Sequence, residues 1–209
     1  MSRHPLLPLL MAASLLAPAG QAADTWRLSK DEDGVQVYLS QVPGSRYQSY
    51  RGVVDIQADV STLSDLQENL RVACAWLYAC AQMELLKVKG DETWVYMKTK
   101  LPWPAEPRDL VLHVVTERKD NGKLLRRIKA VPHYRPRVKG YIRVPYLSGL
   151  WIFEPTGERQ TRVIYQMRAE PGGEVPAWLA NRFVIDAPME TLRTLRAVAE
   201  RQGIRAPKP

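Results

Sequence analysis

Hydrophobic and polar residues alternate along most of this chain, and the period of two gives way to a helical period in only two segments. Alternation places successive side chains on opposite faces of a strand, so most of the chain is expected to form a sheet with one apolar face. Asn121–Gly122 and Thr156–Gly157 favour short turns between antiparallel strands. The expected strands are residues 25–30, 34–41, 46–56, 81–90, 92–100, 109–119, 123–131, 141–155 and 160–170.

The two helical segments are residues 59–78 and 174–202. In the first, a polar cap region at Asp59 precedes leucines that are spaced three and four residues apart. The second is longer, and Pro188 is expected to interrupt or kink it near its middle. A long antiparallel sheet curls, and a terminal helix can cover its apolar concave face. We therefore expect an α+β fold in which a curved antiparallel sheet wraps around the long C-terminal helix and encloses an apolar cavity.

Residues 1–22 have the layout of a secretory signal peptide, with Arg3 near the start, an apolar stretch, and small residues at Gly20 and Ala22. The apolar stretch is too short to span a bilayer, which takes about 20 residues. We expect cleavage after Ala22 and export across the inner membrane to the periplasm. Residues 23–209 are then expected to form one domain.

Cys74 and Cys80 are the two cysteines of the chain. Export brings them into an oxidising compartment, which favours a disulfide over two free thiols. Positions six apart in an unbroken helix are separated by a rise of about 9 Å, too far for a disulfide, so pairing requires the helix to end between them. The alternative is that both are small buried hydrophobic residues.

The formal net charge of +8 makes nucleic acid a partner to consider. The basic residues are spread over 118–129, 133–143 and the C-terminus, where acidic residues lie among them. We therefore expect no nucleic-acid partner. A solvated surface, or a transient attraction to an anionic membrane surface, accounts for the charge. A monomer is expected.

The sequence lacks the motifs of several enzyme classes. It contains no G-x-S-x-G, no G-x-G-x-x-G, no P-loop and no H-E-x-x-H. The two cysteines with His113 and His133 lack the tight spacing of four zinc ligands. We expect no cofactor, no metal site and no catalytic residue, and we interpret the adjacent Arg108 and Asp109 as a structural ion pair or cap.

Several groups of residues occur together as they do in a known family. They are Pro102, Trp103 and Pro104 with Arg108 and Asp109, then Trp151 and Pro155, then Thr161, Arg162, Val163 and Tyr165, then Pro171, Gly172 and Gly173, then Pro176, Trp178, Leu179 and Asn181. In this pattern, which covers about residues 25–202, the chain resembles the bacterial branch of the START domain, the StAR-related lipid transfer module. The resemblance implies the helix-grip (START/Bet v 1-like) fold and a lipid or other hydrophobic ligand. The expected export departs from the pattern of this family, because its better known members are cytosolic or membrane-tethered.

The expected cavity wall follows from which side of each strand is apolar. Val163, Tyr165 and Met167 share one side of their strand, opposite Arg162 and Gln166. Alternation does not decide the facing of residues 94–97 and 150–153, because both of their sides are apolar. His113 is the expected polar contact, and a satisfied core histidine is the alternative. The expected ligand-binding residues are Trp94, Tyr96, His113, Trp151, Phe153, Val163, Tyr165, Met167 and Trp178.

Three functions are compatible with these features. The favoured one is binding, with transfer, of a lipid or other apolar small molecule, because an apolar cavity needs no catalytic residue for it. The alternatives are a polyketide cyclase-like enzyme with His113 or Tyr165 as proton donor, and a ligand-free module that binds other proteins. For a ligand to enter, the terminal helix is expected to move about residues 171–173 and to place Arg193 and Arg196 near anionic head groups. A rigid, solvated helix is the alternative.

Overall fold

The computed structural model describes residues 25–205, so the expected signal peptide at 1–22 lies outside the described residues. One ten-stranded sheet is the largest structural unit of this part of the chain. Its strands are β1 (Arg27–Glu32), β2 (Val35–Ser40), β3 (Ser49–Ile56), β4 (Cys80–Lys89), β5 (Glu92–Thr99), β6 (Arg108–Arg118), β7 (Leu124–Ala130), β8 (Ile142–Arg143), β9 (Tyr146–Gly157) and β10 (Gln160–Glu170). The helices are α1 (Val60–Glu68), α2 (Leu70–Ala73) and α3 (Ala177–Arg205).

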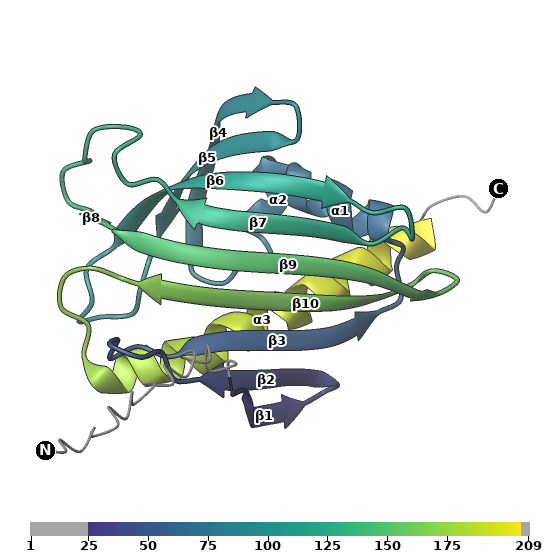
Figure 1. Cartoon of the computed structure of the whole chain (residues 1–209), viewed down its shortest axis with the longest axis horizontal. Helices are drawn as coiled ribbons and strands as arrows, with labels where there is room; N and C mark the ends of the chain where they lie inside the picture. Colours follow the sequence, from purple (N-terminus) through teal and green to yellow (C-terminus); the bar gives the residue numbers. More distant parts are fainter. Residues whose placement is uncertain (1–24, 206–209) are drawn as a thin grey trace, which may run out of the picture.

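The strands follow the order β1-β2-β3-β10-β9-β7-β6-β5-β4, and every neighbour in this order is antiparallel. The N-terminal strands and the later hairpins are thus confirmed. The expected strand at 141–155 is divided, because Val144 and Pro145 separate β8 from β9 and proline donates no ladder hydrogen bond. β8 instead pairs in parallel with β6. The sheet curves around α3, as Figure 1 shows, which is the expected helix-grip arrangement.

α3 crosses the concave face of the sheet and packs against β2 and β3 (Figure 1). Gly52 on β3 permits this close approach. A Cβ at that position would lie 2.5 Å from Leu192 Cδ1 and 3.1 Å from Pro188 Cβ, which is too close for the present packing. The expected interruption at Pro188 is not found, because α3 continues through this residue as one element from 177 to 205.

The segment expected as one helix at 59–78 is shorter and broken. Asp59 caps α1 by accepting a hydrogen bond from the amide of Thr62, as expected of a polar cap residue. Asn69 ends α1 and caps α2, and its side chain accepts from the amide of Arg71. The helix has ended at Cys74, which forms a disulfide with Cys80 across a Cα–Cα distance of 4.9 Å.

The main hydrophobic core lies between α3 and one half of the sheet. Val54, Phe153 and Val163 from the strands are buried there against Leu192 and Leu195 from the helix. A smaller cluster around Met97, Leu110 and Leu112 belongs to the other half of the sheet, formed by β4 to β7. Contacts between α3 and the strands are concentrated on β2 and β3. The half of the sheet formed by β4 to β7 is therefore not packed closely against the helix.

Candidate functional site

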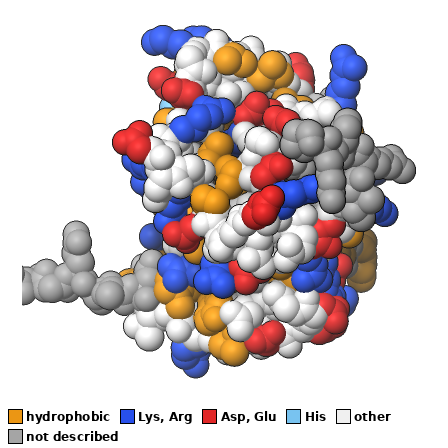
Figure 2. Space-filling view, turned by 90° about the vertical axis from the view of Figure 1, so that its right-hand side faces the viewer, with side chains coloured by type: hydrophobic (Ala, Val, Ile, Leu, Met, Phe, Trp, Pro, Cys, Tyr) orange, Lys and Arg blue, Asp and Glu red, His pale blue; other side chains and the backbone are white. Residues whose placement is uncertain are grey.

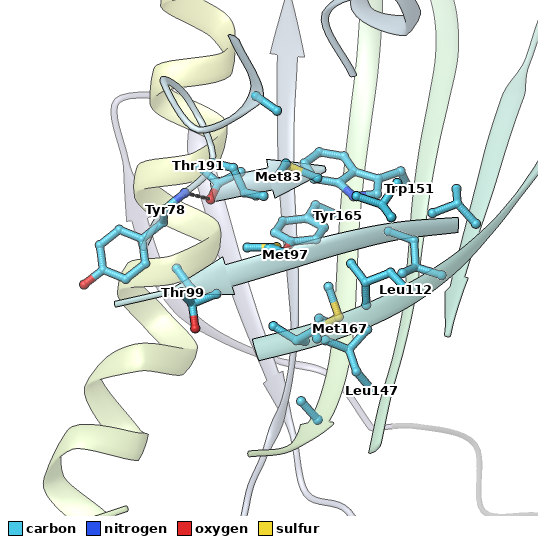
Figure 3. Close-up of a pocket in the computed structure, with 18 of the residues that line it drawn as sticks. Tyr78, Met83, Met97, Thr99, Leu112, Leu147, Trp151, Tyr165, Met167 and Thr191 are labelled. Carbon is cyan, nitrogen blue, oxygen red and sulfur yellow. Dashed lines mark hydrogen bonds between the residues drawn. The ribbon is translucent and has the colours of Figure 1, made fainter. Parts of the chain in front are cut away.

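A cavity of about 530 Å³ lies between the concave face of the sheet and α3. Figure 3 shows side chains from β5, β6, β9 and β10 directed into the same space. The wall is mostly apolar, and its apolar residues include Trp76, Met83, Val95, Met97, Leu110, Leu112, Ile128, Leu147, Trp151, Tyr165, Met167, Leu179, Phe183, Val184 and Ala187. A volume of this size falls within the range of about 300–1,000 Å³ that is typical of small-molecule sites.

Strand alternation explains which residues reach the wall. Val95 and Met97 pair with Leu112 and Leu110, so the odd positions of β5 and the even positions of β6 share the concave face. Each strand thus contributes every second residue to the cavity. The segment between α2 and β4 closes the cavity on another side, where the amide of Tyr78 donates a hydrogen bond to Thr191 Oγ1 on α3 (3.1 Å; Figure 3).

Aromatic side chains form one continuous part of the wall. The ring of Trp151 stacks on that of Tyr165 with centroids 3.9 Å apart, and Trp76 meets Trp151 edge-on at 6.1 Å. The hydroxyl of Tyr50 donates to that of Tyr165 at 2.9 Å. Burial raises the pKa of Tyr165 to about 12 and also raises that of Tyr50, so both phenols stay neutral near neutral pH.

Five of the expected ligand-binding residues lie on the concave face. Trp151, Tyr165 and Met167 line the cavity. Phe153 and Val163 share that face but are fully buried in the core beside α3, outside the cavity. The apolar side of residues 160–170 was therefore assigned correctly from the sequence, and contact of these residues with a ligand stays a prediction.

Three other expected residues lie on the convex face, so their expected facing was wrong. Trp94 and His113 are paired across β5 and β6, and their rings stack at 4.4 Å on the side away from the cavity. His113 Nε2 lies 2.7 Å from a Glu92 carboxylate oxygen. Tyr96 donates to Asp109 at 3.0 Å. The register of β5 makes Val95 and Met97 the concave residues, which apolarity on both sides had concealed.

Trp178 is also not on the wall. It is 57% exposed in the first turn of α3, and the next residues, Leu179 and Ala180, line the cavity in its place. The hydrophobic sequence around Trp178 gave no sign of this one-residue difference. Helical geometry separates neighbouring residues by about 100°, so adjacent positions face different surroundings.

Arg108 and Asp109 do not pair with each other, so the ion pair, one of the two structural roles expected for them, was wrong. As neighbours in β6 they point to opposite faces. Asp109 accepts from Arg143 Nε at 2.9 Å and from Nη2 at 2.8 Å. Burial acts to raise the pKa of Asp109, but hydrogen bonds from Arg143 and Tyr96 prevail and lower it. Arg108 faces the cavity, a position that alternation with Leu110 and Leu112 would have revealed.

A second buried arginine, Arg126 on β7, also lines the cavity. Its guanidinium donates to Gln67 Oε1 and Ser64 Oγ, both at 2.8 Å, and pairs with Glu68. Burial lowers the pKa of Arg126, and the nearby carboxylate of Glu68 partly offsets this decrease. This cation is therefore neutralised by α1 and joins that helix to the sheet.

The arginines expected near a membrane are engaged within the protein. Arg193 binds Glu32 at 2.5 Å and Asp33 at 2.8 Å, and Arg196 donates to the Asp33 carbonyl at 2.7 Å. They join α3 to the turn between β1 and β2. Figure 2 views the end of the molecule where α3 finishes, and its visible surface carries Lys and Arg among Asp and Glu.

Neither a metal cluster nor a membrane-spanning helix is found in the part of the chain that the structure describes. Residues 25–205 contain no group of three or more His, Cys, Asp or Glu side chains placed to hold a metal ion. No helix in the same range is both long and apolar enough to cross a bilayer.

The START domain model matches residues 10–205 of this chain. An uncharacterized protein of Pseudomonas aeruginosa is 52% identical over 194 residues, which are 92% of this chain and 96% of that relative. The phosphatidylcholine transfer protein of Mus musculus is 30% identical over 179 residues, 81% of this chain and 80% of that protein.

Solved structures agree with these sequence comparisons. The STAR-related lipid transfer protein of Xanthomonas axonopodis has a TM-score of 0.79 at 36% identity, covering 84% of this chain and 99% of that one. Human StAR-related lipid transfer protein 5 has a TM-score of 0.77 at 18% identity, with coverage of 85% and 88%, which shows the fold alone. The Zhui aromatase/cyclase from Streptomyces shares the fold at a TM-score of 0.54 and 12% identity, with coverage of 74% and 94%.

Proposed function

Because the chain belongs to the START domain family, we propose that it binds a lipid or a similar hydrophobic molecule in the cavity between its sheet and α3 and transfers it between membranes. The relatives named for lipid transfer support this proposal. The observation that carries it is the cavity itself, whose wall is built from apolar side chains of β4, β5, β6, β7, β9, β10 and α3.

The energetics of burial support a lipid. Each methylene removed from water contributes about 0.8 kcal/mol, so an acyl chain of about 16 carbons gains on the order of 13 kcal/mol before entropic costs are subtracted. Burial in the cavity provides this free energy without any chemical reaction of the ligand. Both phenols of the aromatic wall are held neutral by burial, so the apolar part of the wall adds no charge that would oppose an acyl chain.

Exposed tryptophans support contact with a membrane during transfer. Trp103 is 89% exposed and Trp178 is 57% exposed, although tryptophan is usually mostly buried. Trp103 belongs to the segment before β6, and Trp178 to the start of α3. Arg108 joins the segments that precede β6 and α3, because its guanidinium donates to the carbonyls of Glu106 and Gly172. We propose that both indoles enter the membrane interface, where aromatic rings with a polar group are favoured.

Export to the periplasm is also part of the proposal. The signal-like pattern of residues 1–22 and the Cys74–Cys80 disulfide both support an oxidising compartment. Mass spectrometry of the protein from fractionated host cells tests this. We expect a chain that begins at Ala23 in the periplasmic fraction, and an unprocessed chain in the cytoplasm would contradict export.

Native mass spectrometry of the protein purified from its own host, followed by organic extraction, tests the binding proposal. We expect one hydrophobic molecule for each chain, removable by extraction. An empty protein that turns over a polyketide-like substrate would favour the enzyme, and an empty protein that captures neither lipid nor substrate would favour a protein-binding module.

A further inference from the structure

The cavity carries a buried positive charge that no carboxylate neutralises. Arg108, the first residue of β6, is 2% exposed and lines the cavity. It is one of three buried arginines in the described part of the chain. Arg126 pairs with Glu68 and Arg143 with Asp109. Among the described residues no carboxylate lies within ion-pair distance of Arg108, and the exposed Glu106 acts on it only from farther away.

Backbone carbonyls fix this guanidinium in place. Its Nη1 donates to the Glu106 carbonyl, and its Nη2 to the carbonyls of Gly172 (3.2 Å) and Glu174 (3.4 Å). Gly173 lies beside this contact with a left-handed backbone (φ 58°), and a Cβ there would lie only 2.6 Å from Ile142 Cδ1. These partners are neutral, so they orient the cation without cancelling its charge. Burial accordingly lowers the pKa of Arg108.

Two hydrogen-bond donors at this end of the cavity are left without a partner among the described residues. Arg108 Nε and the hydroxyl of Tyr47 are both buried and make no hydrogen bond there. Tyr47 also lines the cavity and is close enough to act electrostatically on Arg108. A buried donor without an acceptor is unfavourable, and more so when it is charged. Such a cost is removed when an anion accepts from both donors.

We propose that Arg108 and Tyr47 form a subsite for the anionic oxygen group of the ligand's head, a carboxylate or a phosphate, while the apolar wall holds its hydrocarbon. This inference rests on the proposed function and adds to it the charge class of the ligand. Hydrogen bonds to a charged group are stronger than neutral ones, and the buried position of Arg108 protects them from screening by salt. The cavity thus selects an anionic amphiphile over its neutral counterpart.

The test compares ligands that differ only in charge. Delipidated full protein is titrated with cis-parinaric acid and with its methyl ester, and binding is followed by probe fluorescence. We expect the acid to bind at least about tenfold more tightly than the ester, as a charged hydrogen bond predicts. The preference should shrink as the pH falls and the probe's carboxyl group becomes protonated. A fluorescent phosphatidic acid, compared with the diacylglycerol of the same chains, shows whether phosphate is the better head.

Variants assign the preference to the subsite. Arg108→Gln should abolish the preference for the acid, because the charged contact with the head group is lost. Arg108→Lys should keep part of the preference. Tyr47→Phe, which removes one hydroxyl and preserves the ring, reports on the site even if Arg108→Gln fails to fold. Lys129→Gln on the convex face is the matched control and should change nothing.

Each outcome decides the inference separately from the proposed function. Equal binding of acid and ester by the wild-type protein, or an unchanged preference in Arg108→Gln and Tyr47→Phe, would show that Arg108 only fixes the backbone, and the anionic subsite would be rejected. If neither member of either pair binds, the proposed function fails as well.

Discussion

Arg143 holds both carboxylate oxygens of Asp109, through Nε at 2.9 Å and Nη2 at 2.8 Å, in an ion pair that is almost completely shielded from solvent. The same guanidinium donates to the carbonyls of Pro132, Arg135 and Pro136. It therefore fastens residues 131–143 to the convex face of β6. This additional layer explains why Val111 is fully buried although it faces away from the cavity.

We predict that Asp109→Asn lowers the free energy of unfolding by about 3–5 kcal/mol, because Arg143 is left as a buried charge without its partner. The pKa of Asp109 is lowered in the folded protein, so its contribution is present above the ordinary carboxyl pKa and is lost as the pH falls through the lowered value. Urea unfolding of the wild type and the variant at neutral and acidic pH measures the loss of free energy and its dependence on pH.

The gap in stability between wild type and Asp109→Asn should therefore narrow in acid. Asp55→Asn is the control, since Asp55 pairs with Arg162 at 2.9 Å on the surface. It should cost under about 1 kcal/mol. Equal costs for the two variants would contradict the importance of the buried pair.

The contact between Gly52 and Leu192 gives a second prediction. Gly52→Ala should destabilise the protein by about 1–3 kcal/mol, because the new methyl group overlaps Leu192 and Pro188. Leu192→Ala removes the obstructing side chain and should cost about 2–5 kcal/mol alone. The double variant should cost less than the sum of the two, as denaturant unfolding can measure. Strict additivity would mean that α3 does not approach β3 as closely as the structure has it.

The exposed indoles of Trp103 and Trp178 give a third prediction. Replacing both with serine should slow lipid transfer between vesicles and leave ligand binding in solution unchanged, because neither side chain lines the cavity. Thermal unfolding should show a change within about 0.5 kcal/mol. Tyr134→Ser, at a residue that is 45% exposed, serves as the control. Transfer rates that do not respond to the tryptophan changes would remove the support for membrane contact at this end.

The order of strands and helices could be predicted from the sequence because alternation and turn residues are local signals. The facing of Tyr165 and Met167 toward the cavity could also be predicted, since charged neighbours mark the outer side of their strand. The sequence did not predict which face of the sheet Trp94 and His113 occupy. Their strands are apolar on both sides because residues 131–143 cover part of the convex face, a long-range contact that leaves no local pattern.

The arginines show the same limit. Arg193 and Arg196 stand in a basic helical segment, which suggested a surface free to meet lipid head groups. Their partners Glu32 and Asp33 are 160 to 163 residues away in sequence, and only folding brings them together. Charge reversal at Arg193 would place a carboxylate beside those of Glu32, Asp33 and Glu190 and damage the fold, so it would not test membrane contact.

Transfer of fluorescent phosphatidylglycerol and phosphatidylcholine between vesicles tests the central claim most directly, when it compares two variants of β7. Ile128 faces the cavity and Lys129 faces solvent, so the same new side chain can be placed on either side of the strand. Ile128→Trp fills part of the cavity and should abolish transfer of the probe that the wild type carries, whereas Lys129→Trp should leave it unchanged. Transfer that survives in Ile128→Trp, with the variant folded, would contradict carriage of lipid in this cavity.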